Sequence, residues 1–189
     1  MVNASSAITV VGTYLGGEGA TRSEPRTWIS ATLDGLLLDR HFGRTKQTGV
    51  RERFVQKGTD VLNLRQVSIV SEEELAEIAG ALRLPDVTAE DLGANICLRG
   101  VARLTQLPAG TLLLFESGAV LFVTGENKPC TGLGEELQWR YLSRRRLAEK
   151  FVRAALGKRG LVAIVVKPGL IKTGSAVEIR TPNSHHAVP

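Results

Sequence analysis

Residues 111–130, TLLLFESGAVLFVTGENKPC, contain two apolar runs separated by the dipeptide Ser117-Gly118. Short runs rich in Leu, Val and Phe are typical of strands, and a small polar residue with glycine between them is typical of a tight turn. The stretch therefore predicts a β-hairpin with strands at 111–117 and 119–125. Directly after the second strand comes Cys130, one of only two cysteines in the chain.

Apolar runs of the same kind recur on both sides of this hairpin. They predict further strands at 7–12, 27–35, 64–70, 94–100, 160–169 and 170–179. Several short strands with turn residues between them favour a mainly β fold, a closed or partly closed β-barrel with one or two covering helices. The alternative is an open sheet covered by helices.

The clearest helix is predicted for residues 71–82, SEEELAEIAGAL. Ser71 and Glu74 have the spacing of a capping box, in which each side chain bonds the backbone N–H of the other residue. Leu75, Ile78 and Leu82 recur on one helical face. Pro85 prevents the helix from continuing.

A second helix is predicted for residues 134–156, with Leu147 and Phe151 facing the core. Arg146, Lys150 and Arg153 share another face and form a basic stripe. Residues 40–62 have no clear period, and a connection of this length inside a domain is usually functional or mobile.

Composition indicates one globular domain, residues 1–189, with a flexible tail at 181–189. Hydrophobic residues make up 43% and charged residues 23%, which is ordinary for a folded protein. The two cysteines show no CxxC spacing, which argues against a structural zinc site and favours a reducing compartment. No basic leader and no apolar run of membrane-spanning length is visible, so we expect a cytoplasmic protein without a membrane partner.

The net charge of +5 is unevenly distributed. Residues 40–57 hold six basic residues against one acid, and residues 140–159 hold eight against one. Such concentration favours an anionic partner, either a nucleic acid or a phosphorylated small molecule. The alternative is that these residues form solvated helix faces and loops.

Cys130 is the first candidate for chemistry. Pro129 fixes its own backbone and restricts Lys128, so the thiol is held at the end of a strand by stiff backbone. Positive charge beside a thiol favours attack on electrophiles and binding of soft metals. The alternative is a small residue that only packs. Cys97, inside a predicted strand, is expected to be buried and inert.

His41 lies in DRHFG at the start of the first basic segment. It is a candidate for orienting a ligand or donating a proton near neutral pH, and the alternative is a surface histidine without a task. The glycines of residues 12–19 lack the spacing of a dinucleotide-binding loop, and no P-loop signature is present. His185 and His186 are expected to lie in the tail and are not counted as candidates.

Taken in order, several segments resemble the MOSC domain, a module found at the C-terminus of molybdenum-cofactor sulfurases and as small stand-alone proteins. They are LDGLLLDRHFG (33–43), NLRQVSIVSEEELAEIA (63–79), LGANICLRG (92–100), LPAGTLLLFESGAVLFVTGENKPC (107–130) and GKRGLVAIVVKPGLIKTGSAVEI (157–179). The resemblance covers about residues 35–177, and its most specific part is the terminal Pro-Cys.

The resemblance implies a β-barrel of the MOSC type whose cleft holds the molybdenum cofactor, or handles its sulfur, at Cys130. In related enzymes that reduce N-hydroxylated compounds, the matching cysteine is a molybdenum ligand. In sulfurases the sulfur comes from a separate PLP-dependent domain, which this chain does not resemble, so PLP is not expected. By position in the motifs, the expected cofactor-binding residues are His41, Asn63, Arg65, Asn95 and Arg159, with Lys128 adding positive charge beside Cys130.

The chain departs from the pattern of many relatives at three positions. Leu38 stands where they carry glycine, and Ser175 stands where they carry aspartate; both changes are expected to alter turns. Ala94 stands where they carry an acid, which would remove a carboxylate from the cleft.

Three functions are compatible with these residues. The first is a molybdenum-cofactor-binding protein, a carrier or a component of a molybdenum-dependent oxidoreductase, with Cys130 as catalytic residue and metal ligand. The second is a sulfurtransferase that carries a persulfide on Cys130. The third is a nucleic-acid-binding small barrel that uses Trp139 and Tyr141 beside Arg140 and Arg144, although no RNP-like motif is visible. Expected partners are the anionic pterin cofactor and a separate redox protein or cysteine desulfurase.

Overall fold

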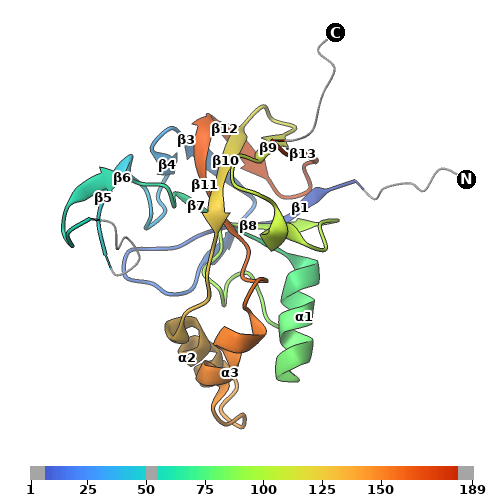
Figure 1. The fold of residues 1–189 in the computed structure, drawn as a ribbon. Helices are drawn as coiled ribbons and strands as arrows, with labels where there is room; N and C mark the ends of the chain where they lie inside the picture. Colours follow the sequence, from blue (N-terminus) through green and yellow to red (C-terminus); the bar gives the residue numbers. More distant parts are fainter. Residues whose placement is uncertain (1–6, 50–54, 183–189) are drawn as a thin grey trace, which may run out of the picture.

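The computed structural model describes residues 7–49 and 55–182 (Figure 1). Most of the predicted tail and part of the first basic segment, including Arg51 and Arg53, lie outside these residues. The fold is mainly β, as predicted, with three α-helices in the described ranges. None of the described helices has both the length and the apolar character needed to cross a membrane.

The largest sheet has eight strands. In spatial order they are β13 (Val177–Arg180), β9 (Leu112–Phe115), β10 (Val120–Glu126), β11 (Leu161–Lys167), β7 (Val67–Ser71), β8 (Ile96–Arg99), β1 (Thr9–Leu15) and β2 (Glu24–Arg26). Neighbouring strands are antiparallel except β7 and β8, which are parallel. One isolated bridge, Thr9 with Ala176, links β1 to the residue before β13. The sheet is not closed beyond this bridge, so the closed barrel is not confirmed.

Two small sheets accompany the large one. The first contains β12 (Gly169–Lys172), β3 (Trp28–Thr32) and β4 (Gly35–Leu36), and the second contains β5 (Thr45–Gln47) and β6 (Asp60–Leu62). The prediction of one strand over 170–179 was wrong, because a turn at Gly174, with a φ of 90°, separates β12 from β13. The β5–β6 hairpin lies in the region for which no period was visible.

The hairpin predicted at 111–125 is confirmed. Strands β9 and β10 pair in register, with Leu113 opposite Leu121. The N–H of Gly118 donates to the carbonyl of Phe115 at 2.8 Å, and its φ of 88° is a value that glycine adopts without strain. Strand β10 then leads to Cys130.

Helix α1 (Glu72–Leu82) joins the parallel strands β7 and β8, as a crossover helix must. The hydroxyl of Ser71 accepts a hydrogen bond from the N–H of Glu74 at 3.3 Å. The Glu74 carboxylate does not serve the reciprocal half of the predicted capping box: it accepts from the N–H and the hydroxyl of Thr105.

The second predicted helix is two helices, so the prediction of one helix over 134–156 was wrong. They are α2 (Thr131–Arg140) and α3 (Leu147–Ala154), and they pack against each other beside α1 (Figure 1). Arg146 has a φ of 58° and starts α3 in a new direction. A side chain at Gly134 would come within 2.6 Å of the Ala148 backbone, so glycine is what lets the two helices approach this closely.

Two apolar clusters form the core. One lies between the strands and includes Val67, Ile69 and Leu121. The other joins the three helices to β8 and contains Phe151 and Cys97. Cys97 is buried as predicted, and burial together with nearby glutamates raises the pKa of its thiol to about 12.

Candidate functional site

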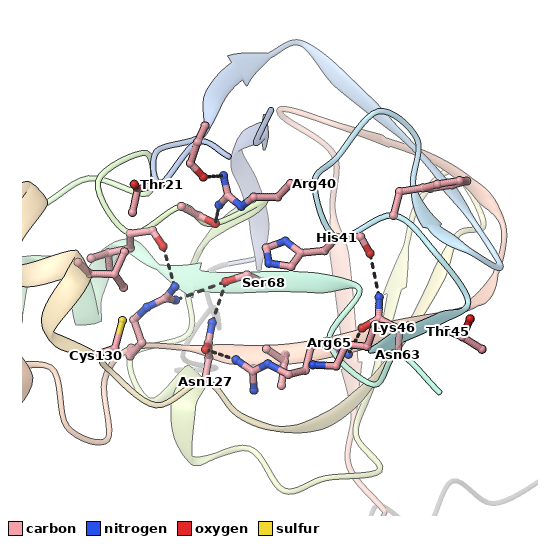
Figure 2. A pocket seen from close by; sticks show the side chains of 17 residues that line it. Thr21, Arg40, His41, Thr45, Lys46, Asn63, Arg65, Ser68, Asn127 and Cys130 are labelled. Atoms are coloured by element: carbon pink, nitrogen blue, oxygen red, sulfur yellow. Dashed lines mark hydrogen bonds between the residues drawn. The ribbon is translucent and has the colours of Figure 1, made fainter. Parts of the chain in front are cut away.

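A cleft of about 420 Å³ collects most of the predicted site residues (Figure 2). It is lined by Ala20, Thr21, Arg40, His41, Phe42, Thr45, Lys46, Asn63, Arg65, Ser68, Leu92, Gly93, Asn127, Cys130, Leu133, Arg159 and Val162. Its volume is typical of small-molecule sites. The described lining includes three arginines and one lysine and no carboxylate, so the cleft favours an anion.

Cys130 lies at one end of this lining, at the N-terminus of α2. Its backbone is extended, with φ −135° and ψ 162°, and the helix begins at the next residue. The thiol is free and only partly buried. Lys128 is exposed and does not line the cleft. Of the two residues, Cys130 therefore lines the cleft and Lys128 does not.

Asn127 and Ser68 form a buried polar link that sequence reasoning missed. Asn127 Nδ2 donates to Ser68 Oγ at 3.0 Å, and Asn127 Oδ1 accepts from Arg65 Nη2 at 2.7 Å. Arg159 Nη1 also donates to Ser68 Oγ, at 3.3 Å. Arg65 and Arg159 are therefore connected by one series of hydrogen bonds that runs through Asn127 and Ser68.

Arg159 is buried, although arginine is seldom buried without partners. Its Nη2 donates to the carbonyl of Leu92 at 2.6 Å. Gly160 follows it with a φ of 91°, and a side chain there would come within 2.0 Å of the Ile69 carbonyl oxygen. Because the backbone at Gly160 lies this close to β7, the guanidinium of Arg159 reaches the lining of the cleft.

Asn63 holds the backbone of the loop that carries His41. Its Nδ2 donates to the carbonyls of His41 at 2.8 Å and Gly43 at 3.0 Å, and its Oδ1 accepts from the N–H of Arg65. The predicted role of Asn63 near the cleft fits its position, but these contacts are with the backbone of the chain.

Asn95 lies one layer beneath the cleft, where it does not contribute to the lining. Its Nδ2 donates to Asp39 Oδ2 at 2.8 Å, and its Oδ1 accepts from the N–H of Ser68 at 2.9 Å. Asp39 Oδ1 in turn lies 3.1 Å from Nδ1 of His41. Asn95 therefore supports His41 through Asp39 and does not line the cleft.

Burial alone would raise the pKa of the Asp39 carboxyl. Hydrogen bonds from the His41 ring and from the backbone N–H groups of Gly16 and His41 outweigh this effect and lower the pKa below its ordinary value. Asp39 is thus a carboxylate at neutral pH. None of the described lining residues is an aspartate or a glutamate, and among them Asp39 forms its hydrogen bonds with His41.

The two basic segments, residues 40–57 and 140–159, differ in how many residues they contribute to the cleft. Arg40 lines the cleft, but its guanidinium donates to the carbonyls of Ala20, Arg22 and Gly93, which fastens two loops together. From residues 140–159 only Arg159 lines the cleft. In the predicted basic stripe, Arg146 pairs with Glu149 on the exposed side of α3.

The model of the MOSC domain family matches residues 38–178 of this chain. The chain belongs to the MOSC domain family. The matched residues include every residue that lines the cleft except Ala20 and Thr21. The resemblance noted from the sequence motifs is therefore confirmed.

YuaD of Bacillus subtilis (strain 168), which is named for metal-sulfur cluster biosynthesis, is a curated relative of this MOSC protein. The two are 41% identical over 171 residues, which span 87% of this chain and 89% of YuaD. The crystal structure of YuaD superposes with a TM-score of 0.90 at 39% identity, covering 93% of this chain and 96% of YuaD.

More distant structures share the fold alone. YiiM from Geobacillus stearothermophilus has a TM-score of 0.62 at 15% identity, covering 94% of this chain and 77% of YiiM. YiiM from Escherichia coli has a TM-score of 0.56 at 16% identity, covering 92% of this chain and 70% of that protein. The MOSC architecture thus extends well beyond recognisable sequence identity.

Proposed function

We propose that this MOSC protein binds the molybdenum cofactor in the cleft, with Cys130 as the sulfur ligand of the metal, and acts as a carrier or as a component of an oxidoreductase. The observation that carries the proposal is that one cleft combines a partly exposed thiol with buried and half-buried arginines. A phosphorylated pterin that bears a soft metal centre needs both kinds of residue.

The donor set fits such a group. Arg65 and Arg159 are held by the chain through Asn127 and Ser68, so their positions are fixed before a ligand arrives. Preorganised guanidinium groups bind phosphate with little further loss of side-chain entropy. We assign the phosphate end of the ligand to these arginines with Lys46.

Cys130 would hold the metal. The described residues contain no group of three or more His, Cys, Asp or Glu side chains able to bind a metal ion. A metal near Cys130 would therefore take most of its ligands from the cofactor, whose dithiolene supplies sulfur. When bound, the cofactor would supply a redox-active centre, with electrons coming from a separate protein.

The second candidate is a persulfide carrier that acts through Cys130. It draws support from the partial exposure of the thiol and from the name of the relative YuaD, which refers to metal-sulfur clusters. In this case the thiol would receive sulfur from a separate cysteine desulfurase and pass it to an acceptor bound by the arginines.

Nucleic-acid binding is less well supported. Arg140 forms ion pairs with Asp86 and Asp91, and the Tyr141 hydroxyl donates to Asp86. Arg140 and Tyr141, two of the residues that suggested this function, are therefore engaged within the protein, whereas Trp139 is 75% exposed.

The decisive experiment is metal and pterin analysis of full-length protein purified from its own host. Near-stoichiometric molybdenum with a pterin is expected in the wild type, and both are expected to fall in Cys130→Ser and Arg159→Met. Cys97→Ala is the matched cysteine control, because Cys97 lies in the helical core cluster and does not line the cleft. Absence of molybdenum and pterin from the wild type, with a persulfide on Cys130, would favour the second candidate.

A further inference from the structure

We propose that His41 exchanges a proton with the ligand of the cleft through its Nε2 atom, and that Asp39 is the positioning residue that keeps Nε2 available. The identity of the ligand rests on the proposed function, but the state of the His41 ring does not.

Both carboxylate oxygens of Asp39 are surrounded by donors. Oδ1 accepts from the backbone N–H of His41 at 2.9 Å and lies 3.1 Å from His41 Nδ1. Oδ2 accepts from the N–H of Gly16 and from Nδ2 of Asn95, each at 2.8 Å. The side chain is fully buried, with no exposed surface. An ionised carboxylate can only accept hydrogen bonds, and this environment stabilises that state.

The contact between Asp39 and His41 therefore fixes which ring nitrogen carries the proton. Since the carboxylate accepts, Nδ1 must donate, and the neutral ring is left with a lone pair on Nε2. The His41 side chain is 45% exposed, and its ring lies among the side chains that line the cleft (Figure 2). Nδ1 faces the buried carboxylate, so Nε2 is the nitrogen available to a ligand.

Proton exchange at this atom is balanced without any further reactant. A proton leaves an acidic group of the ligand, or a water beside it, and binds the Nε2 lone pair. The resulting imidazolium keeps the hydrogen bond from Nδ1 to the Asp39 carboxylate. The same proton returns from Nε2 to the ligand when the exchange reverses.

The backbone around the ring is held on both sides, as a positioned proton carrier requires. Asn63 bonds the His41 carbonyl, and Asp39 bonds the His41 N–H. Leu38, directly before Asp39, has a φ of 70°, a left-handed conformation that costs a non-glycine residue energy. Such strain is found where a turn must aim a side chain.

The test is nuclear magnetic resonance of the imidazole nitrogens in full-length protein without cofactor. The chain contains three histidines, so a variant with His185→Gln and His186→Gln leaves His41 as the single imidazole. With ¹⁵N-labelled histidine, the neutral ring is expected to show a protonated Nδ1 and an unprotonated Nε2. A ring protonated mainly at Nε2, or an even mixture, would overturn the proposal without any change at Asp39.

Asp39→Asn tests the cause in the same background. The asparagine amide can donate to Nδ1, so the proton is expected to move to Nε2. Asp34→Asn is the control, because Asp34 is half-exposed and pairs with Arg44; the tautomer is expected to stay unchanged. An unchanged tautomer in Asp39→Asn, with circular dichroism showing a folded protein, would remove Asp39 from the proposed role.

Acylation by diethyl pyrocarbonate gives a second readout, because the reagent reacts with an unprotonated imidazole nitrogen. Asp39→Asn is expected to slow modification of His41 by about tenfold or more, since the remaining lone pair then faces a buried side chain. An equal rate in both proteins would contradict the proposal. These measurements use no cofactor, so they can fail while the metal and pterin analysis succeeds, or the reverse.

Discussion

The Nη2 atom of Arg65 donates a 2.7 Å hydrogen bond to Oδ1 of Asn127, a residue 62 positions further along the chain. Asn127 in turn bonds the Ser68 hydroxyl, which also accepts from Arg159. Two cations of the cleft thus share one neutral, buried connection. Removing the Asn127 side chain is expected to affect the positions of both Arg65 and Arg159.

Asn127→Ala is expected to lower the free energy of unfolding by about 1–3 kcal/mol, because it leaves buried polar groups without their partners. Urea denaturation measures the change. Gln106→Ala is the control, since Gln106 is exposed, and it is expected to stay within about 0.5 kcal/mol of the wild type. Equal stability of both variants would show that the Asn127 link is energetically minor.

Leu38→Gly is expected to raise the free energy of unfolding by up to about 1 kcal/mol. Leu38 adopts a φ of 70° and is 80% exposed. Glycine avoids the cost of this conformation, about 1–2 kcal/mol, and loses part of the gain through its larger unfolded-state entropy. The same substitution at the neighbouring Leu37, whose φ is negative, is expected to destabilise. In thermal unfolding, the midpoint temperature is expected to rise for Leu38→Gly and to fall for Leu37→Gly.

Gly134→Ala is expected to cost about 1–3 kcal/mol of stability, because the new methyl group would meet the Ala148 backbone at 2.6 Å. Gly132→Ala in the same helix meets nothing within 4 Å and is expected to stabilise by up to about 1 kcal/mol. Chemical denaturation of the two variants distinguishes the effect of helix packing at Gly134 from the effect of helix propensity alone at Gly132. A stabilised Gly134→Ala would mean that α2 and α3 approach less closely than described.

Glu74 predicts a dependence of stability on pH. Burial raises the pKa of its carboxyl above the ordinary 4.5, against the opposing effect of hydrogen bonds from Thr105. Between the unfolded and folded pKa values the folded state binds more protons, so the free energy of unfolding falls as the pH rises through this interval. Glu74→Gln is expected to reduce this fall in urea titrations at successive pH values. Glu135→Gln, on an exposed part of α2, is expected to leave it unchanged.

Local patterns predicted the local elements well. The hairpin of β9 and β10 and the helix α1 depend on residues close in sequence, and both are confirmed. The break in residues 134–156 was missed because no proline or glycine marks it: α2 ends before Tyr141, whose backbone is not helical, and α3 begins after Arg146, whose φ is 58°. Closure of the sheet was also not predictable, because it depends on contacts between the first and last strands.

The site was predicted in part. Five residues named from motif positions line one cleft: His41, Asn63, Arg65, Cys130 and Arg159. Their role towards a ligand stays a prediction. Asn95 was also predicted to lie near the cleft, but it is buried and does not belong to the lining. Ala94, where an acid was expected in relatives, is fully buried in the helical core cluster and does not line the cleft.

The supporting residues were missed for a different reason. Asp39, Ser68 and Asn127 act through hydrogen bonds between segments that are far apart in the chain. Ser68 is a polar residue on the buried strand β7, and Asn127 directly follows β10. Neither position identifies the partner.

The shared connection of Arg65 and Arg159 has a consequence for the protein in the cell. The fold gathers positive charges in one cleft before any anion is present, and their repulsion opposes the folded state. A ligand that binds only the folded chain shifts the folding equilibrium by mass action. Unliganded chains would then unfold more often and be degraded sooner. Under the proposed function, the abundance of this protein would therefore follow the supply of the ligand, even when its synthesis is constant.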